Sequence, residues 1–324
     1  MRISNFSMAR NYRTNLTKNQ YTMYKANEKV QTGRRFSTMS EDVSSGLRAF
    51  QVRRSLAKNE TSIDNVRDVQ TFYKSAEDSV NHIQQIGQEV AGLYTTALNG
   101  TSKEDELNAI SKQVTRLQEE ILTTLNGQFS DRYMFGGTQI TSAPFATNAD
   151  GYLTYKGVVV KDITDKDSDL YKELFDDPSY IDLGLGLELN GDKSELVPNT
   201  VFDRSLNGLD IIGYGPDNMY DVITDILNSM AGESPDPKHL DRINSAYKDT
   251  AVYLTKLGAD VNYLDFTMDR LEADNLNLIA RQDALEFIPR EEAILDWQMQ
   301  NYVYNAALSM GSKLLQPSLF SYLS

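Results

Sequence analysis

The fold is decided by residues 240–278, which read LDRINSAYKDTAVYLTKLGADVNYLDFTMDRLEADNLNL. Apolar side chains recur here in alternating steps of three and four residues, the spacing of a coiled-coil heptad. A period of 3.5 residues kept over this length predicts a long helix that packs along a narrow seam. The stripe consists of Leu240, Ile243, Tyr247, Thr250, Leu254, Leu257, Val261, Leu264, Met268, Leu271, Asn275 and Leu278.

Two further helical segments precede this stretch. Heptad-like spacing between residues 52 and 97 predicts a helix of about 50 residues, or about 75 Å at 1.5 Å per residue. Thr101 and Glu104 have the T-x-x-E spacing of a capping box, which opens another helix. The apolar stripe of that helix runs over residues 107–125, and we expect it to stop near residues 128–129.

The middle of the chain has a different character, because residues 138–215 are rich in Gly, Asp and Tyr. Residues 152–155, 158–160 and 181–189 read as strands, the last by strict alternation. The sequence therefore predicts a mainly α protein, an elongated coiled-coil helical bundle or rod with a small β-rich insertion domain at the distal tip. The predicted divisions are 1–40 with 287–324, 41–137 with 216–286, and the insertion 138–215.

The two ends carry matching apolar stripes, and we predict that they pair with each other and with copies of themselves. Gly33 can end the first helix in a left-handed conformation. Pro289 cannot donate to a helix ladder and separates the last helix from residues 240–278. Gly33, Arg35 and Pro289 are therefore the predicted hinge residues. The stripes are Tyr12, Leu16, Met23, Ala26 and Val30 near the N-terminus, and Val303, Ala306, Met310 and Leu314 near the C-terminus.

Composition excludes several partners. The net charge of −14 argues against general binding of nucleic acids or of anionic membranes, which need clustered Lys and Arg. Mean hydropathy is −0.46, and no stretch approaches the roughly 18 apolar residues of a membrane span. Cys is absent, and the N-terminal residues lack the apolar region of a secretory signal, so we expect any export to use another route.

No catalytic constellation is visible, and we expect no enzyme activity, no cofactor and no metal site. The two His residues, His82 and His239, lie far apart in sequence. No Asp or Glu stands in a context that predicts a raised pKa. Residues 165–169 resemble the start of a calcium loop, but Leu170 and Asp176 occupy the positions where that loop needs Gly and Glu.

Several polar or aromatic positions have two interpretations. The pairs 34–35 and 53–54 are Arg-Arg, and they are either solvated helix-end charges or intersubunit ion pairs. Trp297 is either a core residue or an anchor for a neighbouring subunit. Four Asn residues on the predicted seams either fix register or lie at partly exposed positions: Asn19, Asn59, Asn275 and Asn301.

Motifs at both ends and after residue 131 resemble the bacterial flagellin family and its hook–filament junction members. The N-terminal motif is MRISN at residues 1–5, with QTGRR at 31–35 and SED at 40–42. RYMFGGT at residues 132–138, followed by APF at 143–145, is similar to the junction members. The C-terminal motif is LSM at 308–310 with LFSYL at 319–323. Residues 44–47, SSGL, are closer to the filament-forming flagellins.

The resemblance implies a structural adaptor of the bacterial flagellum, secreted unfolded through type III export, that joins the hook-associated ring to the filament. Its implied partners are a ring of its own copies, the neighbouring hook-associated protein and flagellin. An export chaperone is implied on the C-terminal helix. The implied assembly residues are Ile3, Tyr12, Leu16, Met23 and Val30 with Trp297, Val303, Met310, Leu314, Leu319, Phe320 and Leu323.

Two alternatives stay open at this point. The first is a flagellin, a subunit that forms the filament itself. The second is a non-flagellar type III secretion tip or translocator protein, which would also be coiled-coil and free of Cys. Because the ends carry little apolar surface, we expect brief proteolysis to remove residues 1–40 and 285–324 first.

Overall fold

The computed structural model describes residues 5–99, 104–163, 171–172, 174, 178–184, 186, 201–232 and 235–314. The chain is mainly α-helical with small antiparallel sheets, as the sequence predicts. It divides into two compact units, which we call unit 1 (residues 1–60 and 273–324) and unit 2 (residues 61–272). The finer divisions expected from the sequence, including a separate insertion domain, stay predictions.

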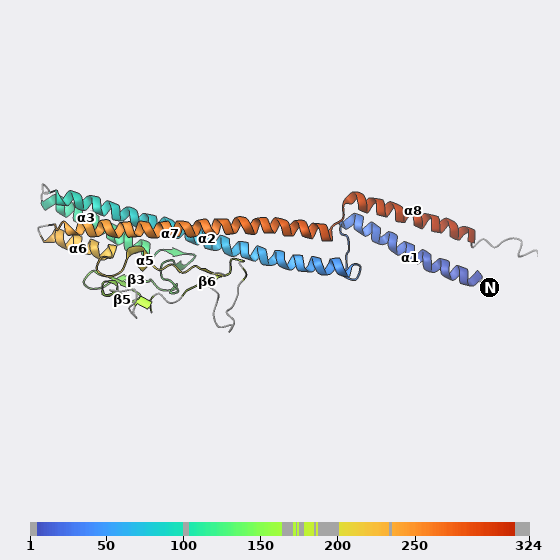
Figure 1. Ribbon diagram of the computed structural model, residues 1–324, viewed down its shortest axis with the longest axis horizontal. Coiled ribbons are helices and arrows are strands. Elements are labelled where there is room, and N and C mark those ends of the chain that lie inside the picture. Colours follow the sequence, from blue (N-terminus) through green and yellow to red (C-terminus); the bar gives the residue numbers. More distant parts are fainter. Residues whose placement is uncertain are drawn as a thin grey trace, which may run out of the picture. The chain divides into compact units, whose positions relative to one another are not determined.

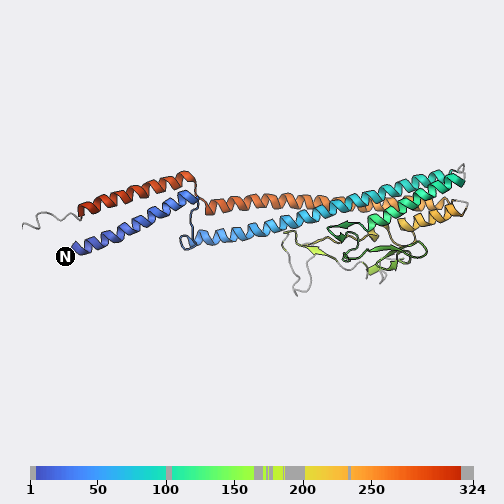
Figure 2. The same cartoon turned by 180° about the vertical axis from the view of Figure 1, so that it is seen from behind.

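Unit 1 contains the two terminal helices, α1 (Asn5–Thr32) and α8 (Arg290–Leu314). It also holds the first part of α2 (Val43–Leu98) and the last part of α7 (Lys238–Glu286). Helices α1 and α8 lie side by side in both views (Figures 1 and 2).

The helix end predicted at Gly33 is confirmed. Gly33 follows α1 with a φ of 68°, the left-handed conformation that Gly adopts without a steric penalty. Its N–H donates to the Lys29 carbonyl at 2.8 Å. Asp42 caps α2, because the Ser45 N–H donates to its Oδ1 at 3.0 Å.

Unit 2 packs α3 (Glu104–Leu125) and α6 (Met219–Ala231) with the rest of α2 and α7. The predicted stripes form its core. Ile83 and Val90 of α2, Ile121 of α3 and Leu264 of α7 are completely or almost completely buried in one continuous cluster. A short helix, α5 (Leu209–Ile212), adds further apolar side chains.

Helix α3 ends at Leu125, so the expectation that it reaches residues 128–129 is wrong. The next residue, Asn126, turns its side chain to another segment. Its Nδ2 donates to the Phe145 carbonyl at 2.9 Å, and its Oδ1 accepts from the Phe145 N–H at 3.1 Å. These two bonds hold the chain against the residues that follow Pro144, and residues 128–129 form a strand instead.

Strands in unit 2 are short, and every pair is antiparallel. β1 (Gln128–Phe129) pairs with β2 (Arg132–Tyr133). β3 (Phe145–Thr147), β4 (Leu153–Tyr155) and β5 (Val158–Val159) form one sheet in that order, followed by the 3-10 helix η1 (Val160–Asp162). β6 (Tyr180–Ile181) pairs with β7 (Phe202–Asp203). In Figures 1 and 2 these elements lie along one side of the unit 2 helices.

The strand predicted over residues 181–189 is wrong where the structure describes it, because β6 ends at Ile181. Gly184 and Gly186 have φ values of 76° and 85°, which an extended strand does not contain. Gly184 lies against α2, where a Cβ would come within 2.8 Å of Ser62 Oγ. These two glycines therefore let the backbone turn instead of continuing as a strand, and Gly184 also lets it approach α2 closely.

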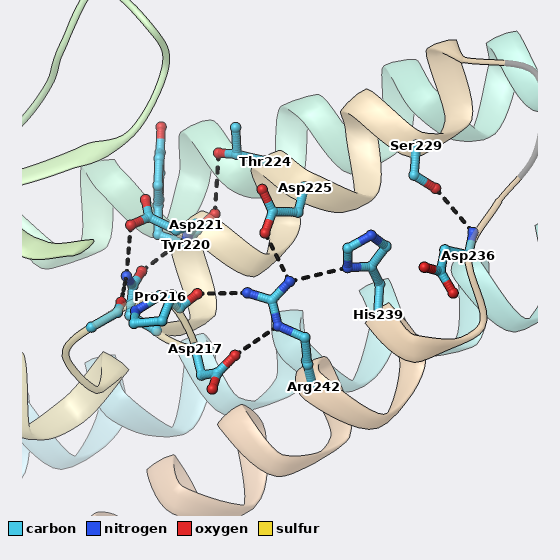
Figure 3. A network of polar contacts seen from close by, with 12 residues as sticks. Pro216, Asp217, Tyr220, Asp221, Thr224, Asp225, Ser229, Asp236, His239 and Arg242 are labelled. Atoms are coloured by element: carbon cyan, nitrogen blue, oxygen red, sulfur yellow. Dashed lines mark hydrogen bonds and ion pairs between the residues drawn. The ribbon is translucent and has the colours of Figure 1, made fainter. Parts of the chain in front are cut away.

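Polar contacts fix the start of α6 to α7 and β4 (Figure 3). The Arg242 guanidinium donates to Asp217 at 2.7 Å, to Asp225 at 2.8 Å and to the Pro216 carbonyl at 2.6 Å. Asp221 is fully buried and accepts from the Leu153 N–H at 2.9 Å. Burial raises the pKa of Asp221, so the expectation that no carboxyl has a raised pKa is wrong.

Candidate assembly surface

Helices α1 and α8 pack through small residues near the end of α1 and in the first turn of α8. Ala26 of α1 and Ala293 of α8 are 2% and 1% exposed. The Tyr12 hydroxyl donates to the Ala307 carbonyl at 3.0 Å. A Cβ on Gly311 would lie 1.9 Å from the Tyr12 Oη, so a glycine makes room for this ring. The predicted N-terminal residues Tyr12, Leu16, Met23 and Val30 are half-buried.

The terminal helices pair, and in the described part of the predicted α8 stripe Ala306 is half-buried. Val303 and Met310 are 40% and 64% exposed, while Ala293 and Gly311 are buried. The reason is steric, because small residues let the Tyr12 ring and the α1 backbone approach closely. Trp297 is half-buried. The other predicted positions, Ile3, the Leu314 side chain, Leu319, Phe320 and Leu323, lie outside the described residues.

The far side of α8 carries a row of exposed apolar side chains. Leu295, Met299, Tyr302 and Met310 are 61–76% exposed and lie opposite the face that contacts α1. Tyr21 and Tyr24 of α1 are also more than half exposed. Such a surface is typical of a helix pair that another apolar surface covers.

The predicted hinge residues are brought together where the terminal helices begin and end. The Ile288 N–H donates to the Gly33 carbonyl at 3.0 Å, and the Arg35 N–H donates to the Glu286 carbonyl at 2.7 Å. The Pro289 carbonyl accepts from the Ala293 N–H at 3.0 Å and starts α8. Backbone hydrogen bonds therefore join the connector that follows α1 to the connector between α7 and α8.

One connector is also held by a group of charges around Lys25. The Lys25 Nζ lies 2.8 Å from Glu28 and 2.7 Å from Glu41. The Ser37 N–H donates to the other Glu41 oxygen at 2.9 Å. The bond from Lys25 is the largest cause of the lowering of the pKa of Glu41 to about 2. The group fixes the connector to the end of α1.

The two residues of the second Arg-Arg pair, Arg53 and Arg54, have different surroundings, which the sequence did not indicate. Arg53 donates from its guanidinium to the Glu286 carboxylate, whose side chain is 4% exposed. This contact lowers the pKa of Glu286. Arg53 is thus paired within unit 1, which neither interpretation anticipated. Its neighbour Arg54 is exposed.

Within the described ranges, no group of three or more His, Asp or Glu side chains could hold a metal ion. No helix in the described part of the chain is long and apolar enough to cross a membrane.

Comparison with known proteins agrees with the sequence resemblance. Residues 3–139 match the model of the bacterial flagellin N-terminal helical region. Polar flagellin F of Vibrio parahaemolyticus is 20% identical over 122 residues, 38% of this chain and 31% of that protein. Flagellar hook-associated protein 3 of Salmonella typhimurium is 25% identical over 154 residues, 47% of this chain and 48% of that protein. The chain thus matches less than half of the length of either relative.

The fold has a counterpart among solved structures. A Vibrio parahaemolyticus protein, provisionally assigned as flagellar hook-associated, superposes with a TM-score of 0.59 at 15% identity. The match covers 76% of this chain and 100% of that one. Flagellins and hook-associated proteins are structural proteins, which agrees with the prediction that the chain is not an enzyme. Residues 3–139 therefore resemble the N-terminal region of bacterial flagellins, part of the chain is similar in sequence to flagellar hook-associated protein 3, and the fold is similar to that of the Vibrio parahaemolyticus protein.

Proposed function

We propose that the chain is a structural adaptor at the hook–filament junction of the bacterial flagellum. Its copies form a ring between the preceding hook-associated protein and flagellin. The surface of unit 1 supports this proposal most directly, because its helices leave one apolar face uncovered after the other face has packed. The predicted residues Val303 and Met310 would contact neighbouring subunits on this face, whereas the half-buried Trp297 lies one turn from Ala293, on the side that contacts α1.

The small number of buried apolar side chains in unit 1 also bears on export and localisation. Unit 1 has few buried apolar side chains, so its helices are stable only against partners, and the chain can pass unfolded through a type III apparatus. A cytosolic chaperone would cover the exposed row on α8 before export. The assembled protein would lie outside the cell, in the flagellum.

Deletion of the encoding sequence tests this function. We expect a deletion strain to lose swimming motility, to secrete flagellin monomers into the medium, and to recover when the wild-type chain is supplied. The hook should still form, because the proposed position lies beyond it. A deletion strain that swims normally would contradict the proposal.

Flagellin is the second candidate, because polar flagellin F matches the chain as well. The two functions differ in what the purified chain does on a seed. A junction adaptor adds a limited layer to hook ends and stops, whereas a flagellin extends long filaments. Electron microscopy of seeded samples distinguishes them, and extended filaments would favour flagellin.

A further inference from the structure

The first turns of α2 carry a second apolar stripe that packs on nothing in the described part of unit 1. Val43, Leu47 and Phe50 are 69%, 53% and 59% exposed. They are spaced by four and three residues, and Arg54 occupies the next position of the same seam. We call these four residues the α2 outer stripe.

The opposite face of α2 is already occupied. Ala49 and Val52 are buried, and Arg53, beside Val52, pairs with the buried Glu286 of α7. At 100° per residue, the outer stripe lies on the side away from Ala49 and Val52. A helix that is apolar on two opposed faces needs two partners, and only one is present within unit 1.

The end of α7, with Phe287 just after it, carries a second row of exposed side chains. Leu276, Ile279 and Phe287 are 69%, 40% and 40% exposed, and Asp283 occupies the seam position between the last two. We call these four residues the α7 outer stripe. A hollow of about 660 Å³ lies at the C-terminal end of this stripe, beside Asp283 and Phe287. Its lining residues are Arg35, Asp283, Ala284, Phe287, Ile288 and Pro289.

The two stripes carry opposite charges. Each presents three apolar side chains and one charged side chain at a heptad position, Arg54 on one stripe and Asp283 on the other. Both charged residues are exposed, and neither forms an ion pair within the described residues. The hollow beside Asp283 can receive a large side chain such as Phe50.

We infer that the α2 outer stripe of one copy docks on the α7 outer stripe of the next copy, with Arg54 opposite Asp283. Pairing of like stripes would instead bring two arginines or two aspartates toward one seam, which disfavours it. A contact between two different surfaces of identical chains is heterologous and closes into a ring when its rotation permits. This inference rests on the proposed function and names the surfaces of the ring contact.

Charge reversal tests the pair in the deletion strain. We expect Arg54→Asp and Asp283→Arg each to abolish swimming, and the double variant R54D/D283R to restore it, because the double variant re-forms an attraction at every interface. Arg48→Asp and Asp274→Arg are the matched controls. They make the same charge changes on exposed positions of the same helices, away from the stripes, and should swim normally.

Purified chains give a second readout. Because the chain has no Cys, Phe50→Cys and Phe287→Cys chains can be mixed and oxidised to trap the contact, in which antiparallel helices with Arg54 opposite Asp283 place Phe50 opposite Phe287. We expect a mixed dimer in this sample. Ser55→Cys mixed with Asn277→Cys, both exposed and off the stripes, should give about tenfold less, the ratio for a preference of about 1.4 kcal/mol. Circular dichroism of every variant checks that its helices are intact.

The outcomes separate this inference from the proposed function. If the double variant is secreted and folded but fails to swim, or if Arg48→Asp is as harmful as Arg54→Asp, the pairing is wrong. If the deletion strain itself swims, the junction function fails, and the docking of the stripes is then decided by cross-linking. Equal yields from stripe and control cysteines would overturn the docking.

Discussion

Unit 1 and unit 2 are built from similar heptad-patterned helices but bury very different amounts of apolar surface. In unit 2 the stripes of α2, α3, α6 and α7 join one cluster that includes Tyr94, Ile121 and Phe145. Among the described residues of unit 1, the buried hydrophobic side chains are Ala26, Ala49, Val52 and Ala293, three of which are alanines. Of the large hydrophobic side chains that are exposed in the described ranges, only Tyr180, Val252, Tyr263 and Phe266 belong to unit 2.

The difference shows that a heptad pattern predicts a partner helix without saying whether the partner lies in the same chain. Unit 2 supplies its own partners and buries both the seam and the flanking positions. Unit 1 supplies a partner for one face of each helix and leaves the other face exposed. We therefore interpret unit 2 as the self-sufficient folding unit and unit 1 as the part that neighbouring copies complete.

The largest expected effect comes from truncating the same kind of side chain in each unit. Ile121 is fully buried, so Ile121→Ala should lower the free energy of unfolding by about 2–5 kcal/mol through lost burial and a cavity. Leu47→Ala in unit 1 should change it by no more than about 0.5 kcal/mol, because the side chain is solvated. Urea unfolding followed by circular dichroism measures both. Equal losses would contradict the division between the units.

An intermediate effect is expected at the ion pair between Arg53, whose side chain is 52% exposed, and Glu286, whose side chain is 4% exposed. Arg53→Ala leaves the Glu286 carboxylate without its partner, and the cost should be about 1–3 kcal/mol in the local stability of unit 1. The pKa of Glu286 should rise toward its ordinary value. Hydrogen exchange at the end of α7 reports the loss. Arg54→Ala is the matched control, since Arg54 is exposed, and its exchange should match that of the wild type.

Sequence periodicity identified the helices, because helix ends and seams depend on local chemistry. Gly33, Asp42 and Pro289 mark ends through backbone conformation, capping and the missing N–H. The alternation of residues 181–189 misled, since a glycine leaves no side chain to define a face. The missed end of α3 depends on Asn126 bonding to Phe145, a contact between segments that no local pattern contains.

The candidate surface was predictable only in part. The stripe on α1 was found because it faces the interior of unit 1. On α8 the apolar stripe and the packed face are different, and the signal for the packed face was the spacing of Ala293, Ala307 and Gly311. Arg53 and Arg54 were indistinguishable in sequence. They differ because Glu286 lies where Arg53 can form an ion pair with it.

The smallest expected effect is a pH dependence that has opposite signs in the two units. In unit 1 the pKa of Glu41 is lowered from 4.5 to about 2, so the carboxylate binds protons less readily in the fold. Its contribution to the connector is present above pH 4.5 and is lost as the pH falls toward 2. In unit 2 the raised pKa of Asp221 means that the fold favours its protonated form, and its contribution grows on acidification.

These two signs can be measured separately at single residues. The Ser37 N–H donates a hydrogen bond to Glu41, and we expect it to lose protection from hydrogen exchange between pH 4.5 and 2. The Leu153 N–H, which donates to Asp221, should keep its protection over the same range. Glu41→Gln should remove the pH dependence at Ser37, and moderate salt should weaken it because Lys25 and Glu41 are solvated. Loss of protection at Ser37 in Glu41→Gln over the same pH range would assign the effect to another group. Loss at both amides together would mean that the two units respond as one, against the separation that their cores indicate.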